Sequence, residues 1–256
     1  ALPPKSPAEL KLLGDTYFPD DLNGTDLALA IYDWSQPDFS RINSLLLFPG
    51  VTQGWIGWEE YFGSGRYVRC SQLGMPGEVC TKENLFTFRP LSLVWNQAQS
   101  NLITWGLENL PTVSSTTYPV LYRGAPEYTA SLVCAQFKEF YDDVAPASGR
   151  PWVTYDLSLE DCLHRYFYVN ATLTLRVFWS TSPVRSEAEK YAGELFYTIK
   201  PSPSHTFQGR DISNFTIATT PNDEVLYHPQ HTFQVETVKW VGDQFQVSLC
   251  DTSCTP

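Results

Sequence analysis

The sequence predicts an α+β fold in which a helical, loop-rich N-terminal lobe precedes a β-rich core. Strand-like segments follow one another with few helices between them over residues 195–249, which is typical of an antiparallel sheet. Helical spacing marks the first part of the chain instead, most clearly over residues 27–34. We therefore expect a single domain over residues 1–256, with the lobe at residues 1–117 and the core at residues 118–250.

Two segments of the lobe have helical periodicity, and a long stretch rich in glycine and proline separates them. In the first, apolar residues recur at the spacing i, i+3, i+4 and i+7 from Leu27, and Thr25 is the expected N-cap. In the second, tryptophans and aliphatic residues repeat at helical spacing from Trp95, and the helix should end at Gly106 or Pro111. No catalytic motif stands out in the lobe.

The core begins with a strand pattern over residues 118–122, followed by Arg123 and Gly124. Strict alternation predicts another strand over residues 172–178. Two helices are expected, one over residues 130–141 and one where Ser186 and Glu189 have capping-box spacing. The remaining strands are expected at residues 195–199, 212–218, 224–227, 231–241 and 245–249, with Gly242 and Asp243 turning the last hairpin.

The composition excludes several classes of partner. The formal net charge is −11 and the isoelectric point is near 4.7, which argues against a nucleic-acid ligand because phosphate binding requires a surface rich in lysine and arginine. No apolar run approaches the length of a membrane span. Eight tryptophans, fourteen tyrosines and fifteen phenylalanines indicate a globular chain with a substantial core.

Cysteines and glycosylation sequons indicate a secreted or extracellular protein. The three N-x-S/T sequons begin at Asn23, Asn170 and Asn214, and the cysteine count is even. No cysteines have C-x-x-C spacing, so a metal site is not predicted. The candidate disulfide cysteines are Cys70, Cys80, Cys134, Cys162, Cys250 and Cys254. Pairing of the first two and of the last two is our expectation, among several possible connectivities.

Three polar positions stand where expected strands end or begin. Arg123 with Gly124 suits an anion, since a guanidinium binds phosphate through two hydrogen bonds and glycine exposes a backbone amide. Ser180 is placed to orient a nearby carboxylate by hydrogen bonding. Glu224 is a carboxylate that can stabilise positive charge developing on a sugar ring. Each of these features by itself is also typical of an ordinary turn.

Taken together, three segments resemble the R-S-E class of mono-ADP-ribosyltransferases and, more narrowly, vertebrate-type ecto-ADP-ribosyltransferases and related NAD glycohydrolases. The segments are residues 121–124 (LYRG), 178–182 (FWSTS) and 223–235 (DEVLYHPQHTFQV). The similarity covers roughly residues 118–240 and adds little about the lobe. It implies a core of two packed, mainly antiparallel β-sheets, with NAD or NADP as the substrate and no further cofactor.

The resemblance also implies a role for individual residues. Arg123 would contact the phosphates of NAD, and the backbone of Gly124 would bind the nicotinamide amide. Ser180 would position Glu224, whose carboxylate would hydrogen-bond the nicotinamide ribose and stabilise an oxocarbenium-like transition state. Tyr191 would stack on nicotinamide, although a core aromatic residue on a helix face is an equally good interpretation of its spacing.

The sequence departs from the family's transferases two residues before the catalytic glutamate. The family has glutamate there for arginine acceptors, or glutamine in relatives with other acceptors, whereas this chain has Asn222. Asparagine has no charge with which to attract a guanidinium. We therefore place NAD glycohydrolase ahead of mono-ADP-ribosyltransferase with a protein acceptor. A non-catalytic extracellular binding module, with Trp55 and Trp58 in its ligand surface, is the third interpretation.

Overall fold

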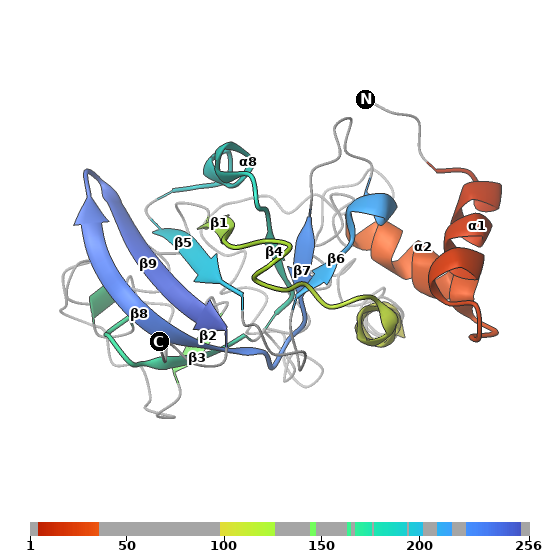
Figure 1. Ribbon diagram of the computed structural model, residues 1–256, viewed down its shortest axis with the longest axis horizontal. Helices are drawn as coiled ribbons and strands as arrows, with labels where there is room; N and C mark the ends of the chain where they lie inside the picture. Colours follow the sequence, from red (N-terminus) through yellow and green to blue (C-terminus); the bar gives the residue numbers. More distant parts are fainter. Residues whose placement is uncertain are drawn as a thin grey trace, which may run out of the picture. The chain divides into compact units, whose positions relative to one another are not determined.

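The computed structural model (Figure 1) describes residues 5–35, 98–125, 144–146, 163–164, 167–175, 177–193, 195–201, 209–216 and 224–251. The chain forms two compact units. One comprises Ala1–Leu110 with Phe215–Thr219, and the other comprises Pro111–Asn214 with Thr220–Pro256. The predicted helix over residues 130–141 lies outside the described residues.

In the first unit, helix α1 (Pro7–Tyr17) begins at a capping box. The Ser6 hydroxyl accepts a hydrogen bond from the Glu9 N–H at 3.3 Å, and the Glu9 carboxylate accepts one from the Ser6 N–H at 2.7 Å. The Ser6 hydroxyl also donates to the Glu9 carboxylate at 2.7 Å, and the hydrogen bonds from the Ser6 N–H and hydroxyl hold the pKa of that carboxyl below its usual range. The capping box therefore fixes where α1 starts.

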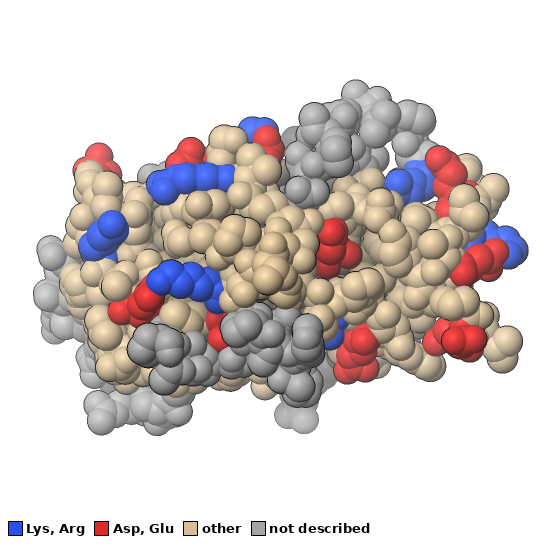
Figure 2. All heavy atoms as spheres, viewed as in Figure 1, with Lys and Arg blue, Asp and Glu red and all other residues tan. Residues whose placement is uncertain are grey.

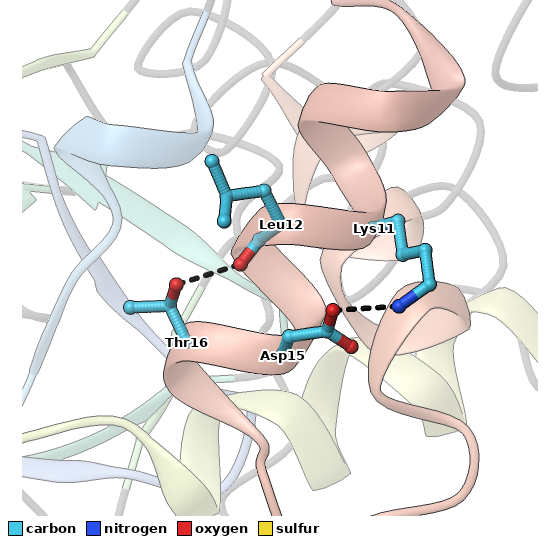
Figure 3. A network of polar contacts seen from close by, with 4 residues as sticks. All are labelled: Lys11, Leu12, Asp15 and Thr16. Atoms are coloured by element: carbon cyan, nitrogen blue, oxygen red, sulfur yellow. Dashed lines mark hydrogen bonds and ion pairs between the residues drawn. The ribbon is translucent and has the colours of Figure 1, made fainter.

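The exposed surface of α1 carries local polar contacts (Figure 3). The ammonium of Lys11 lies 2.6 Å from the carboxylate of Asp15, and the hydroxyl of Thr16 donates to the carbonyl of Leu12 at 2.7 Å. Because the two charged side chains are more than half exposed, this ion pair contributes little to the stability of the fold.

Helix α2 (Gly24–Trp34) buries the predicted apolar positions, including Leu27, Ile31 and Trp34. The predicted N-cap at Thr25 is wrong. Asn23 is the N-cap and makes no side-chain capping bond. At this end α1 packs closely against α2: a Cβ on Gly14 would lie 2.6 Å from the Thr25 nitrogen. The start of α2 is therefore set by packing.

Residues 98–109 are also helical, as predicted. The helix runs through Gly106, where a Cβ would lie 2.9 Å from the side chain of Ile31, and it stops before Pro111. Of the two predicted ends, the one at the proline is therefore correct.

The described part of the second unit contains two sheets, and the α+β prediction with mainly antiparallel sheets is confirmed. The first sheet has the order β1-β5-β9-β8-β3-β2, and the second has the order β4-β7-β6. β5 and β9 pair in parallel, and the other paired strands are antiparallel. The bounds are β1 (Leu121–Ala125), β2 (Val144–Pro146), β3 (Thr172–Leu175), β4 (Trp179–Thr181), β5 (Leu195–Lys200), β6 (Arg210–Asp211), β7 (Val225–Tyr227), β8 (Thr232–Val241) and β9 (Gln244–Asp251).

The predicted hairpin at the C-terminal end of the core is confirmed. Val241 pairs with Gln244, and Gly242 adopts a φ of +61° in the two-residue turn between them, a conformation that favours glycine. A register shift between Val235 and Thr237 interrupts the ladder. A bulge of this kind increases local twist, and the two strands curve together in Figure 1.

Three strand predictions need correction. The strand expected at residues 118–122 is β1, which begins three residues later because it pairs with β5 through Ala125. The strand expected over residues 172–178 ends at Leu175 as β3, residues 177 and 178 are not in a strand, and β4 begins at Trp179 in the other sheet. The strand expected over residues 212–218 is absent from residues 212–216, where a 3₁₀ turn, η3 (Ser213–Phe215), follows β6. The other residues of that segment lie outside the described part.

The helix expected after β4 is short. It is α8 (Arg185–Glu189), and its N-cap is Val184, which makes no side-chain capping bond. The predicted capping box does not form, because the Glu189 carboxylate pairs with the Arg185 guanidinium at 2.7 Å. The chain then turns back to β1, where the Gly193 N–H donates to the Ala125 carbonyl at 2.7 Å.

Candidate active site

The three polar positions predicted from the sequence lie together in the structure. Ser180 is the central residue of β4, and Glu224 immediately precedes β7. Ser180 lies opposite Leu226 in the antiparallel ladder, so Glu224 is its diagonal neighbour on the same face. The Ser180 hydroxyl donates to the Glu224 Oε1 at 2.5 Å. A serine and a carboxylate that are 44 positions apart in the chain thus form a direct pair.

The environment of Glu224 is unfavourable for a negative charge. Burial raises the pKa of its carboxyl above the usual value, and the hydrogen bond from Ser180 acts in the opposite direction. The Ser180 hydroxyl therefore stabilises the ionised form of a half-buried carboxylate. A charge held in this way is well suited to stabilise a positive charge that appears only during a reaction.

Arg123 on β1 contacts β4, the strand that carries Ser180. Its Nη1 donates to the Ser180 carbonyl at 3.0 Å, and its guanidinium lies 4.9 Å from the centroid of the buried Trp179 ring. Next to it, Tyr122 and Ser182 exchange two backbone hydrogen bonds of 2.8 and 2.9 Å. These contacts bring the arginine to the Ser180–Glu224 pair.

Gly124 is required by the packing of β1 against the turn that follows α8. A Cβ at this position would lie 2.2 Å from the Ala188 carbonyl oxygen and 2.5 Å from the Ala192 nitrogen. Tyr191, in the same turn, is 69% exposed. The interpretation of Tyr191 as a core aromatic residue is therefore wrong. The side chain is accessible to a ligand.

The sequence interpretation missed two polar residues next to Glu224. Asp211 and Ser213 hydrogen-bond each other, and the Ser213 hydroxyl accepts the Glu224 N–H at 2.9 Å. A regular strand is expected over residues 212–218, and a strand pattern does not predict side-chain hydrogen bonds to the Glu224 backbone. The only signal in the sequence is an Asp-x-Ser spacing, which is typical of a local side-chain-to-backbone turn.

Several predicted residues are only partly tested by the structure. Asn222 and five of the cysteines lie outside the described residues, and Cys250, which is buried on β9, is disulfide-bonded. The connectivity stays a prediction. The sequon asparagines Asn23, Asn170 and Asn214 are all exposed.

Among the described residues, no cluster of three or more potential metal ligands occurs, and no helix has the length and apolarity needed to cross a bilayer. On the face shown in Figure 2, lysines and arginines are interspersed with acidic side chains and form no continuous basic patch in the described region.

Comparison with known proteins identifies the fold. No family model and no curated protein matches the sequence. Among solved structures, the ADP-ribosyltransferase Vis of Vibrio splendidus in complex with agmatine is similar with a TM-score of 0.51 and 12% identity, over 98% of this chain and 88% of that chain. An ADP-ribosyltransferase of Clostridium botulinum has a TM-score of 0.51 and 14% identity, over 98% of both chains. The Clostridium limosum C3 exoenzyme has a TM-score of 0.51 and 15% identity, over 97% of this chain and 96% of that chain. The chain therefore has an ADP-ribosyltransferase-like fold.

Proposed function

We propose that this protein cleaves the nicotinamide–ribose bond of NAD, with water as the main acceptor, and releases nicotinamide and ADP-ribose. The observation that carries this proposal is the 2.5 Å hydrogen bond between Ser180 and Glu224, with Arg123 bound to the same strand. The ADP-ribosyltransferase-like fold and the three motif segments support NAD as the substrate. No metal or further cofactor is required.

In the proposed reaction, the C–N bond to nicotinamide breaks and its electron pair leaves with the ring nitrogen. Positive charge then develops on the ribose. The ionised Glu224 stabilises this charge, with one carboxylate oxygen held by Ser180 and the other oriented to the ribose. Water attacks C1′ of the ribose and loses a proton to the solvent, which yields ADP-ribose.

Arg123, Gly124 and Tyr191 would bind the substrate. The Arg123 guanidinium is held by the Ser180 carbonyl and the Trp179 ring, so it would bind the pyrophosphate with a smaller loss of side-chain entropy than a mobile arginine. The backbone of Gly124 would bind the nicotinamide amide, and the exposed ring of Tyr191 would stack on nicotinamide.

Water is proposed as the acceptor because of Asn222. A guanidinium acceptor needs an anionic partner. Asn222 is uncharged, and its side chain is shorter than the glutamate or glutamine that the R-S-E transferases have at this position. Transfer to a protein side chain is the second candidate function, and the fold supports it, since one solved structure with this fold is an ADP-ribosyltransferase in complex with agmatine.

Incubation with NAD separates these functions. Nicotinamide release and ADP-ribose formation are followed by chromatography, without an acceptor and with agmatine or a histone mixture. Release that gives free ADP-ribose supports the glycohydrolase, and labelled acceptor supports the transferase. The Glu224→Gln variant keeps the shape of the side chain and removes its charge, so it should lose activity by about a hundredfold or more. Absence of release from the wild-type protein would leave the binding module as the better interpretation.

We also propose that the protein is secreted and glycosylated. The support is the exposure of Asn23, Asn170 and Asn214 together with the even cysteine count. Expression in a secretory eukaryotic host, followed by enzymatic removal of N-glycans, should change the mobility of the protein on a gel. Replacing each asparagine with glutamine assigns the sites, and an unchanged mobility of the wild-type protein would contradict the proposal.

A further inference from the structure

Glu224 is held at its backbone as well as at its carboxylate. It precedes β7, and its own N–H donates to the Ser213 hydroxyl at 2.9 Å. Its carbonyl accepts the Ile212 N–H at 2.8 Å. The Ser180 hydroxyl holds the carboxylate. Three separate contacts therefore fix both ends of a residue that lies outside the regular strand.

The Ser213 hydroxyl is itself oriented by a carboxylate. It donates to the Asp211 Oδ1 at 2.6 Å, and the Ser213 N–H donates to the same oxygen at 2.9 Å. A serine hydroxyl has one hydrogen to donate. Because Asp211 receives that hydrogen, a lone pair of the Ser213 oxygen is directed to the Glu224 N–H.

Asp211 is anchored in turn by Tyr118, whose hydroxyl donates to its Oδ2 at 2.9 Å. Both carboxylate oxygens of Asp211 are thus bound, so the side chain has little freedom to rotate. Tyr118 lies three residues before β1, the strand that carries Arg123. The chain of contacts therefore runs from the segment entering the arginine strand to the backbone of Glu224.

We propose that Asp211 and Ser213 are positioning residues for the reaction: they hold the Glu224 backbone so that its carboxylate stays on Ser180 and faces the ribose. Neither side chain touches the substrate in this proposal. The inference rests on the proposed NAD cleavage by Glu224. It predicts that loss of the Ser213 hydroxyl affects the chemical step rather than substrate binding, because a small displacement of a reacting group has a large effect on rate.

The first experiment compares the kinetics of nicotinamide release. Ser213→Ala should lower kcat about tenfold and leave KM for NAD within about twofold, whereas Ser213→Thr restores the hydroxyl and much of the rate. Asp211→Ala should resemble Ser213→Ala, and Asp211→Asn should have a smaller effect because its amide oxygen can still accept both Ser213 hydrogens. Ser114→Ala, which removes a hydroxyl that hydrogen-bonds Thr116 and Thr117 in the described structure, is the matched control.

A double variant tests whether Ser213 acts through Glu224. In the Glu224→Gln background there is no catalytic charge left to position, so adding Ser213→Ala should change kcat by less than about twofold. A full tenfold loss in that background, a rise in KM alone, or an unchanged kcat in the single variant would each overturn the proposal. The Ser213→Ala variant could also lose rate simply because less of it is folded. In that case Ser213→Thr would fail to restore kcat, and this outcome also counts against the proposal.

The second experiment does not depend on activity. Amide hydrogen exchange at Glu224 should become about tenfold faster in Ser213→Ala, since the N–H loses its acceptor. The Tyr122 amide, which donates to the Ser182 carbonyl, should be unchanged and is the internal control. If the wild-type protein releases no nicotinamide, the proposed function fails, while this measurement still decides the contact: unchanged exchange at Glu224 would show that Ser213 does not hold it.

Discussion

Ser180→Ala is the most direct test of how the candidate site works. In the structure the Ser180 hydroxyl donates to the Glu224 Oε1 at 2.5 Å, and burial raises the pKa of that carboxyl. A hydrogen bond to a charged group contributes about 1.5–3 kcal/mol. If the bond is made to the ionised carboxylate in the transition state, its loss should lower kcat about 10- to 150-fold.

The same substitution has a defined effect on the pH profile. In the proposed reaction Glu224 acts in its ionised form, so nicotinamide release should fall as pH falls through the pKa of Glu224, which burial raises above the usual range. The Ser180 hydrogen bond lowers this pKa. Without it, burial is unopposed, and the acidic limb of kcat should move to higher pH.

The assay is nicotinamide release at saturating NAD from about pH 4 to about pH 9, with each enzyme's stability checked across that range. Ser114→Ala is the control for loss of a hydroxyl elsewhere in the same unit. An acidic limb that stays in place or moves to lower pH would refute the reasoning. A loss confined to KM would show that Ser180 binds substrate and does not tune the carboxylate.

Three further substitutions test other parts of the structure. Burial raises the pKa of Glu224, so ionising this carboxyl destabilises the folded protein as pH rises. Glu224→Gln should therefore match the wild type in urea unfolding below about pH 4 and become the more stable protein at higher pH. A more stable wild type at high pH would contradict this. Gly124→Ala would place a methyl group 2.2 Å from the Ala188 carbonyl oxygen and should lower the free energy of unfolding by about 3 kcal/mol, whereas a stability equal to that of the wild type would show that the turn after α8 can move. Asp251→Ala removes a partner of the buried His231, whose Nε2 lies 2.7 Å from the Asp251 carboxylate. The free energy of unfolding, measured by thermal unfolding, should fall by about 3 kcal/mol, with kcat unchanged at temperatures where the protein is folded. A change in kcat alone would point to a different role.

The sequence indicated which polar residues lie together in the candidate site better than it indicated the bounds of the elements that carry them. Arg123, Ser180 and Glu224 were identified because their residue types recur in the right order in three recognisable segments. Their contact depends on strand pairing across the chain, in particular Ser180 opposite Leu226. Periodicity shows which residues alternate along one strand but does not show which sheet a strand joins. For this reason the continuous pattern over residues 172–178 concealed a change of sheet between β3 and β4.

Boundaries were mispredicted where packing decides them. Nothing in the sequence around Arg123 shows that the arginine lies inside a strand, because that follows from pairing with Tyr197 on β5. The capping-box spacing after β4 was present, but Glu189 pairs with Arg185 instead. The Asp211–Ser213 contacts were missed because a strand was expected over residues 212–218, and local side-chain hydrogen bonds can replace a strand ladder.

Two requirements on Glu224 conflict in the candidate site. The proposed reaction needs Glu224 ionised, whereas burial favours its neutral form. A fully exposed carboxylate would avoid this conflict, but its charge would be screened by water and would stabilise a sugar cation poorly. The structure keeps Glu224 half-buried and supports its charge with the Ser180 hydroxyl, while Ser213 and Ile212 hold its backbone. If this is why the contacts exist, variants that weaken them should lose more rate than their loss of stability accounts for. Equal losses of rate and stability would instead assign these residues to the fold alone.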